Sequence, residues 1–155
     1  MRVLDLACGE GRHSVAAAML GAEVVAIDRD EARLATAREL AEAHELAVDW
    51  RVVDLEGPWP ELGRFDAVLV FSYLDRARMP EILDLVAPRG LLMMESFLTG
   101  QRELGWGPAS EDHLLRSGEL GRLVQPLRVL HGREALEPVD PERWRAVASV
   151  VAVRE

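Results

Sequence analysis

Short, nearly continuous runs of apolar residues alternate with amphipathic segments along most of this chain. The runs lie at residues 2–7, 22–28, 48–54, 65–71 and 91–97. Runs of this length, bounded by turn residues and partly β-branched, are typical of strands that are buried on both faces of a sheet.

The segments between these runs repeat their apolar residues at helical spacing. In the segment 12–20 these residues are Val15, Ala18 and Met19, and after Asp30 they are Leu34, Ala37 and Ala41. Asp30 is a favourable N-cap, and Gly21 is a natural stop for the first helix. The segment 79–90 predicts a third helix that starts near Pro80.

The C-terminal part has a different pattern. A long loop is predicted at 98–112, followed by a short helix around "SGELGRLV" (117–124). Two strands, within 126–136 and 143–155, are joined only by "EPVDPE", which is too short for a parallel crossover, so we expect antiparallel neighbours. Before these two strands, apolar runs alternate with helical segments, which predicts a parallel sheet with helices on both faces. No linker or repeat divides the chain, which predicts one domain over residues 1–155.

Composition excludes several classes of function. The 18 basic residues are all arginine, so neither a Schiff-base lysine nor a P-loop lysine is available. The net charge of −9 disfavours nucleic acid as a partner. One cysteine and four scattered histidines predict neither a disulfide nor a metal site. The apolar runs are too short to span a membrane, and there is no signal peptide, so we expect a cytoplasmic protein.

The stretch "VLDLACGEGRHS" (3–14) predicts a strand that leads into a glycine loop and then a helix. Gly9 and Gly11 match a dinucleotide fingerprint, but Ser14 stands where that fingerprint has its third glycine. Asp28, at the end of the second strand, suits any ribose diol. Asp5 would repel a pyrophosphate, whereas it suits a ligand that carries an ammonium group.

Residues 5–11, "DLACGEG", resemble the D-x-x-C-G-x-G loop of class I S-adenosylmethionine-dependent methyltransferases. "VVDLE" (52–56) and "FSYL" (71–74) are similar to that family's adenine-contacting segment and to its segment beside the reacting centre. "APRGLLMMESF" (87–97) is similar to the stretch that enters strand five, and "GRHS" with "HLLRSGEL" (113–120) looks most like the small-molecule, tellurite-resistance-like branch. The resemblance implies a doubly wound, Rossmann-like α/β fold, with seven strands in the order 3-2-1-4-5-7-6 and strand seven antiparallel.

The resemblance also implies roles for individual residues around S-adenosylmethionine. Asp5 would hold the ammonium group, Arg12 the carboxylate, and Asp28 both ribose hydroxyls. The adenine would lie against Arg29 and Asp54. The remaining cofactor-binding residues implied are Ala7, Cys8, Gly9, Gly11, Leu55, Phe71 and Ser72.

Six further side chains are candidates for the acceptor pocket, each with a second interpretation. They are His13, Tyr73, Arg76, Glu95, Trp106 and His113. The two histidines could face solvent, Tyr73 could serve packing, and Arg76 could belong to a solvated loop. Glu95, late in the fifth strand, could pair with an arginine. Trp106 lies in the long loop, and such loops often form lids.

The resemblance leaves three functions to distinguish. The first is transfer of a methyl group from S-adenosylmethionine to a small-molecule acceptor by in-line displacement, which leaves S-adenosylhomocysteine. The second is a non-catalytic module or partner subunit that binds either compound. The third, a nicotinamide-dependent oxidoreductase, is disfavoured by Asp5 and Ser14.

Most relatives have a segment before strand one that covers the cofactor, whereas Met1 here almost begins that strand. We therefore expect the site to be closed by a second copy in a homodimer or by the loop at 98–112, unless the coding start is truncated.

Overall fold

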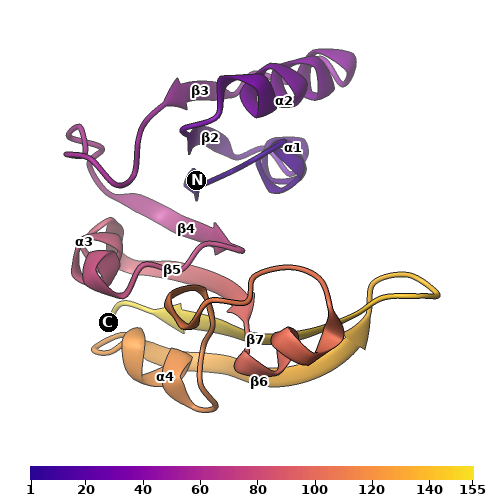
Figure 1. The fold of residues 1–155 in the computed structure, drawn as a ribbon. Helices are drawn as coiled ribbons and strands as arrows, with labels where there is room; N and C mark the ends of the chain where they lie inside the picture. The colour runs from indigo at the N-terminus through magenta and orange to yellow at the C-terminus, as the bar shows by residue number, and fades with distance from the viewer.

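The apolar runs form one seven-stranded sheet in the computed structural model, which describes all residues 1–155 (Figure 1). The strands are β1 (Arg2–Leu6), β2 (Glu23–Asp28), β3 (Asp49–Val52), β4 (Phe65–Phe71), β5 (Val86–Phe97), β6 (Arg128–Pro138) and β7 (Trp144–Val153). Their order is β3-β2-β1-β4-β5-β7-β6. The first five strands are parallel, and β7 runs antiparallel to both β5 and β6. The predicted topology is confirmed.

Helices follow most of the parallel strands. They are α1 (Arg12–Met19), α2 (Glu31–Ala43), α3 (Met79–Asp84) and α4 (Glu119–Leu123), with short 3₁₀ helices η1 (Arg76–Arg78), η2 (Thr99–Leu104) and η3 (Glu111–His113). The predicted cap of α2 is confirmed, because the Asp30 side chain accepts from the backbone N–H groups of Ala32 and Arg33. Figure 1 shows α1 and α2 beside β1 to β3, and α3 and α4 beside the other half of the sheet. None of the helices has the length and apolar character needed to cross a bilayer.

Buried apolar side chains form a large and a small cluster, on opposite faces of the sheet. Paired strand residues share a face and successive residues alternate, so Leu4 and Val68 belong to the large cluster and Val3 and Ala67 to the small one. The predicted inner face of α2 is confirmed, since Leu34, Ala37 and Ala41 are buried. The core therefore fixes the central strands, whose carboxyl ends carry the site.

Two local predictions differ from the structure. Helix α3 ends at Asp84 rather than near residue 90, because Val86 already pairs with Phe65 of β4. The first residues of β5 are irregular, since Pro88 has no N–H group and Arg89 has a φ of 64°. Met19, predicted on the inner face of α1, is 61% exposed, because it is the last residue of a helix that rests on the sheet through small alanines.

The chain reverses its direction of winding at β1, which pairs with β2 on one side and β4 on the other. In open α/β sheets this switch point is where ligands bind, outside the carboxyl ends of the strands. Ala7 and Ser72, which directly follow β1 and β4, have φ values of 59° and 58°. Non-glycine residues rarely adopt this conformation, and such strain is concentrated at functional sites.

The tight fit of Gly11 gives a test of this architecture. A Cβ atom at Gly11 would lie 2.7 Å from Cη2 of Trp50 and 2.8 Å from Cβ of Ala37, whereas one at Gly21 would meet nothing within 4 Å. Both glycines have positive φ values, 77° and 86°. We expect Gly21→Ala to lower the free energy of unfolding by about 1–2 kcal/mol through backbone strain alone. Gly11→Ala should cost roughly 1–3 kcal/mol more because of overpacking. Urea unfolding measures both, and equal losses would contradict the packing described.

Candidate functional site

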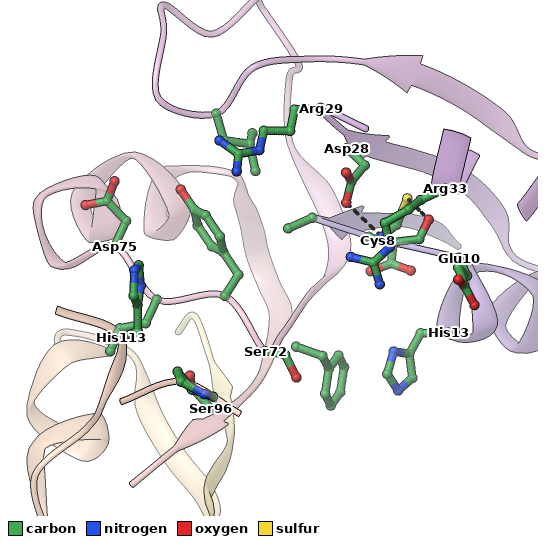
Figure 2. A pocket seen from close by; sticks show the side chains of 18 of the residues that line it. Cys8, Glu10, His13, Asp28, Arg29, Arg33, Ser72, Asp75, Ser96 and His113 are labelled. Carbon is green, nitrogen blue, oxygen red and sulfur yellow. Dashed lines mark hydrogen bonds between the residues drawn. The ribbon is translucent and has the colours of Figure 1, made fainter. Parts of the chain in front are cut away.

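A cavity of about 1130 Å³ lies at the carboxyl ends of β1, β2 and β4. All the residues assigned to the cofactor from the sequence line it: Asp5, Ala7, Cys8, Gly9, Gly11, Arg12, Asp28, Arg29, Asp54, Leu55, Phe71 and Ser72. Of the acceptor candidates, His13, Tyr73, Arg76 and His113 line it as well. Residues from five separate stretches of sequence are thus brought to one place, as Figure 2 shows for those it labels.

Glu95 and Trp106 do not line this cavity, which corrects the acceptor pocket expected from the sequence. Glu95 accepts from Ser149 Oγ at 2.5 Å and pairs with Arg145 Nη1 at 3.2 Å, so its nearest partners are on the neighbouring strand β7. Trp106 donates its indole N–H to the backbone oxygen of Trp144 at 2.7 Å and packs edge-on against Phe97. Both side chains tie the C-terminal strands together.

Asp5 is a buried carboxyl group at the floor of the cavity, with 1% of its surface exposed. Ser14 Oγ donates to Asp5 Oδ2 at 2.5 Å. Burial raises the pKa of Asp5 to about 6, although the Ser14 hydrogen bonds oppose this shift. Ser14 is itself fully buried, so the residue in place of the third glycine positions the carboxyl group. Sequence reasoning noted Ser14 but missed this role.

The Asp28 carboxylate closes the glycine loop onto the end of β2. Its Oδ2 accepts from the N–H of Gly9 at 2.8 Å, and its Oδ1 accepts from the N–H of Asp30 at 2.9 Å. Figure 2 shows the bond to the loop as a dashed line beside Cys8. An ionised carboxylate offers about four acceptor positions, so each oxygen keeps one for a ligand hydroxyl. The loop and the acidic strand end therefore act as one preformed unit.

Arg33 on α2 also reaches into the cavity, which the sequence did not indicate. A Cβ atom at Gly9 would lie 2.7 Å from Arg33 Nη2 and 3.0 Å from its Cζ, so the guanidinium packs directly on the loop. Figure 2 shows it close to Cys8 and Asp28. The glycine at position 9, whose φ is 56°, permits this approach.

The Cys8 thiol is unsuited to nucleophilic chemistry. Burial, together with the negative charges of Asp5 and Asp28, raises its pKa to about 12. The thiol is the unreactive form, so Cys8 acts at neutral pH as a small side chain beneath the loop.

The far wall of the cavity is held in place by Arg76. Its guanidinium donates to both carboxylate oxygens of Glu119, at 2.6 and 2.9 Å, and to the backbone oxygen of Leu114 at 2.7 Å. Longer bonds reach the backbone oxygens of Glu111 and Asp112. Arg76 therefore fixes the segment 111–119, which contributes Asp112 and His113 to the cavity. The guanidinium lowers the pKa of Glu119 to about 2, so this ion pair stays charged throughout the physiological range.

These features define the class of the protein: an α/β domain whose cavity lies at the switch point of the sheet, between acidic strand ends and a glycine loop. Residues 3–90 match the model of the family described as "Methyltransferase domain", and the chain belongs to this family. The ubiquinone biosynthesis O-methyltransferase of Methylocella silvestris is 33% identical over 129 residues, which cover 70% of this chain and 48% of that protein. The chain thus spans about half the length of this curated relative.

Two solved structures share the fold. TehB from Haemophilus influenzae matches with a TM-score of 0.80 and 20% identity, over 99% of this chain and 57% of that one. The magnesium protoporphyrin IX methyltransferase ChlM from Synechocystis PCC 6803, solved with bound S-adenosylmethionine (SAM), matches with a TM-score of 0.71 and 16% identity, over 99% of this chain and 69% of that one. The architecture of the sheet and helices is therefore that of methyltransferases.

The role of Arg76 can be tested without knowledge of the ligand. Arg76→Met removes all its hydrogen bonds and leaves Glu119, whose side chain is 15% exposed, without a counter-ion. We expect a loss of about 1.5–3 kcal/mol in the free energy of unfolding and faster amide hydrogen exchange in 111–119. Arg122→Met, at an exposed arginine of α4, is the matched control. Unchanged exchange in Arg76→Met would show that the segment is held by other contacts.

Proposed function

We propose that residues 1–155 form a single domain that binds SAM and transfers its methyl group to an oxygen atom of a small-molecule acceptor. The observation that carries this proposal is the pair of buried acidic side chains, Asp5 and Asp28, on either side of one glycine loop in one cavity. The relative from Methylocella silvestris is named an O-methyltransferase, which supports an oxygen atom as the methyl acceptor. A second copy that closes the site and a cytoplasmic location stay predictions.

The residues of the cavity fit the polar groups of this cofactor. Ionised Asp5 would hold the ammonium group, and the free acceptor positions of Asp28 would take the two ribose hydroxyls. Asp54, whose Oδ1 already accepts from the N–H of Glu56 at 3.0 Å, would take the adenine amino group next to the buried Leu55. Arg29 would flank the adenine. Arg12, at the start of α1, would pair with the carboxylate.

Bound SAM would supply a methyl group on a sulfonium, which is already an activated leaving group. The chain then has to align the acceptor with that methyl group and to exclude water. Phe71 and Ser72 at the end of β4 border this part of the cavity, and the segment held by Arg76 closes its far side. A metal ion is not required for this chemistry.

The binding part of the proposal is tested by calorimetric titration of the wild type with SAM, S-adenosylhomocysteine (SAH) and NADH. We expect binding of the first two and none of NADH. Asp28→Ala should weaken SAH binding by about 1.5–3 kcal/mol through the loss of charged hydrogen bonds. Asp49→Ala, at an exposed carboxylate of β3, serves as control and should bind like the wild type.

NADH binding with no response to SAM or SAH would contradict the proposal. Binding without transfer to a panel of hydroxyl acceptors would favour the non-catalytic module.

Asp5 predicts how binding depends on pH. Its carboxyl group has a pKa of about 6 in the free protein, so it is mostly protonated below that pH and must lose a proton to hold an ammonium group. SAH affinity should therefore rise with pH, by up to about tenfold per pH unit below 6, and level off above 7.

Two controls isolate this effect of Asp5. Asp5→Asn should bind SAH weakly and with little pH dependence. The wild type should bind methylthioadenosine, which has no amino-acid part, equally well across this range. An equal pH dependence for both ligands would show that Asp5 does not hold the ammonium group.

A further inference from the structure

The His13 imidazole, on the first turn of α1, is unusually placed for a surface histidine. Its ring stacks on Phe71 with the centroids 4.0 Å apart and the planes 22° apart. It lines the cavity, and Figure 2 shows it below the glycine loop, on the side of the cavity that also holds Ser72. No side-chain hydrogen bond or salt bridge of the protein involves the ring, so both nitrogens are free to contact a ligand.

The charged groups around His13 favour its neutral form. Burial and the neighbouring Arg12 guanidinium lower its pKa, and Glu95 on β5 acts in the opposite direction. Glu95 is already paired with Arg145 and accepts from Ser149. At neutral pH one imidazole nitrogen therefore carries a lone pair that can accept a proton.

The wall beside His13 is aromatic. Phe71 pairs with Glu95 across β4 and β5, and Phe97 lies two residues further along β5, so both rings stand on the same face of the sheet. Both line the cavity. Flat apolar walls next to a free imidazole suit a planar, aromatic acceptor whose hydroxyl group points at the imidazole.

We propose that His13 is the general base of this site and that the acceptor is a phenol. The proposal rests on the proposed function, since it concerns the acceptor of the same methyl transfer. In the reaction the phenol oxygen gives its proton to the His13 nitrogen while it forms the bond to the methyl carbon. The carbon–sulfur bond breaks and its electron pair stays on sulfur, which leaves methyl ether, imidazolium and neutral SAH.

Other titratable groups of the cavity are less suited to this role. The Cys8 thiol and the Tyr73 hydroxyl both have a pKa of about 12, because burial and nearby carboxylates disfavour their anions. Asp5 is engaged with Ser14. His113 is exposed and lies on the segment held by Arg76, on the opposite side of the cavity from His13 in Figure 2. His13 has a free nitrogen and a neutral ring, and it lies beside the aromatic wall formed by Phe71 and Phe97.

The experiment follows the maximal rate of methyl transfer to an unsubstituted phenol, at saturating SAM and phenol, as a function of pH. In the wild type this rate should fall at acid pH, below the usual pKa of histidine, because protonated His13 cannot accept the phenol proton; in His13→Gln this fall should be absent. His131→Gln, at an exposed histidine of β6, is the matched control and should behave as the wild type. The unfolding transition of His13→Gln establishes that the variant is folded.

A comparison of two acceptors complements the pH profile. His13→Gln should slow methyl transfer to an unsubstituted phenol by about 10²–10⁴-fold, the range of general-base catalysis. Transfer to para-nitrophenol above its pKa, where no base is needed, should fall far less.

Three results would overturn the proposal: the same pH dependence of the maximal rate in the wild type and His13→Gln, equal slowing with both acceptors, or transfer by the wild type to an aliphatic alcohol but to neither phenol. Failure of SAH itself to bind is a separate result, seen in the calorimetric titration, and it would contradict the proposed function instead.

Discussion

The site depends on one costly constraint: a carboxyl group buried at the end of the central strand. Asp5 follows two buried residues of β1, Val3 and Leu4, and is itself shielded from water, with the Ser14 hydroxyl as its hydrogen-bond partner. Removing a carboxylate from water disfavours its charge, which is why its pKa rises to about 6. A positively charged ligand group beside Asp5 would offset this loss of hydration and favour the ionised carboxylate. The unfavourable placement of Asp5 in the free protein is therefore the basis of its use in binding.

Much of the fold could be predicted from the sequence, because its elements are specified by local patterns. The buried strands are continuous apolar runs, and α2 shows both its cap and its inner face at helical spacing. The prediction failed where long-range pairing overrides local propensity. "MPEILDLVAPRG" has a helical start, yet Phe65 draws Val86 into the sheet and ends the helix at Asp84. A pairing between two residues that lie 21 positions apart leaves no local signal.

The site was predictable where its residues follow directly from strand ends. The glycine loop, Asp28 and Asp54 sit at fixed places in the βαβ pattern, and the structure brings them to one cavity. Glu95 and Trp106 were misplaced because the direction of a side chain late in a strand, or in a loop, depends on neighbours from β7. The sequence did not indicate Arg33 as a site residue for a similar reason, since its approach to Gly9 depends on how α2 packs beside the loop.

The central claim is tested most directly by the free energy of unfolding of the wild type and Asp5→Asn between pH 4 and 8, with and without SAH. In the folded chain the pKa of Asp5 is raised from 3.8 to about 6, so the folded state binds the extra proton and the wild type loses stability as pH rises through this window. The account predicts a loss of roughly 3 kcal/mol, absent in Asp5→Asn and largely restored in the wild type by SAH. Parallel pH profiles of the two proteins, or equal stabilisation of both by SAH, would contradict it.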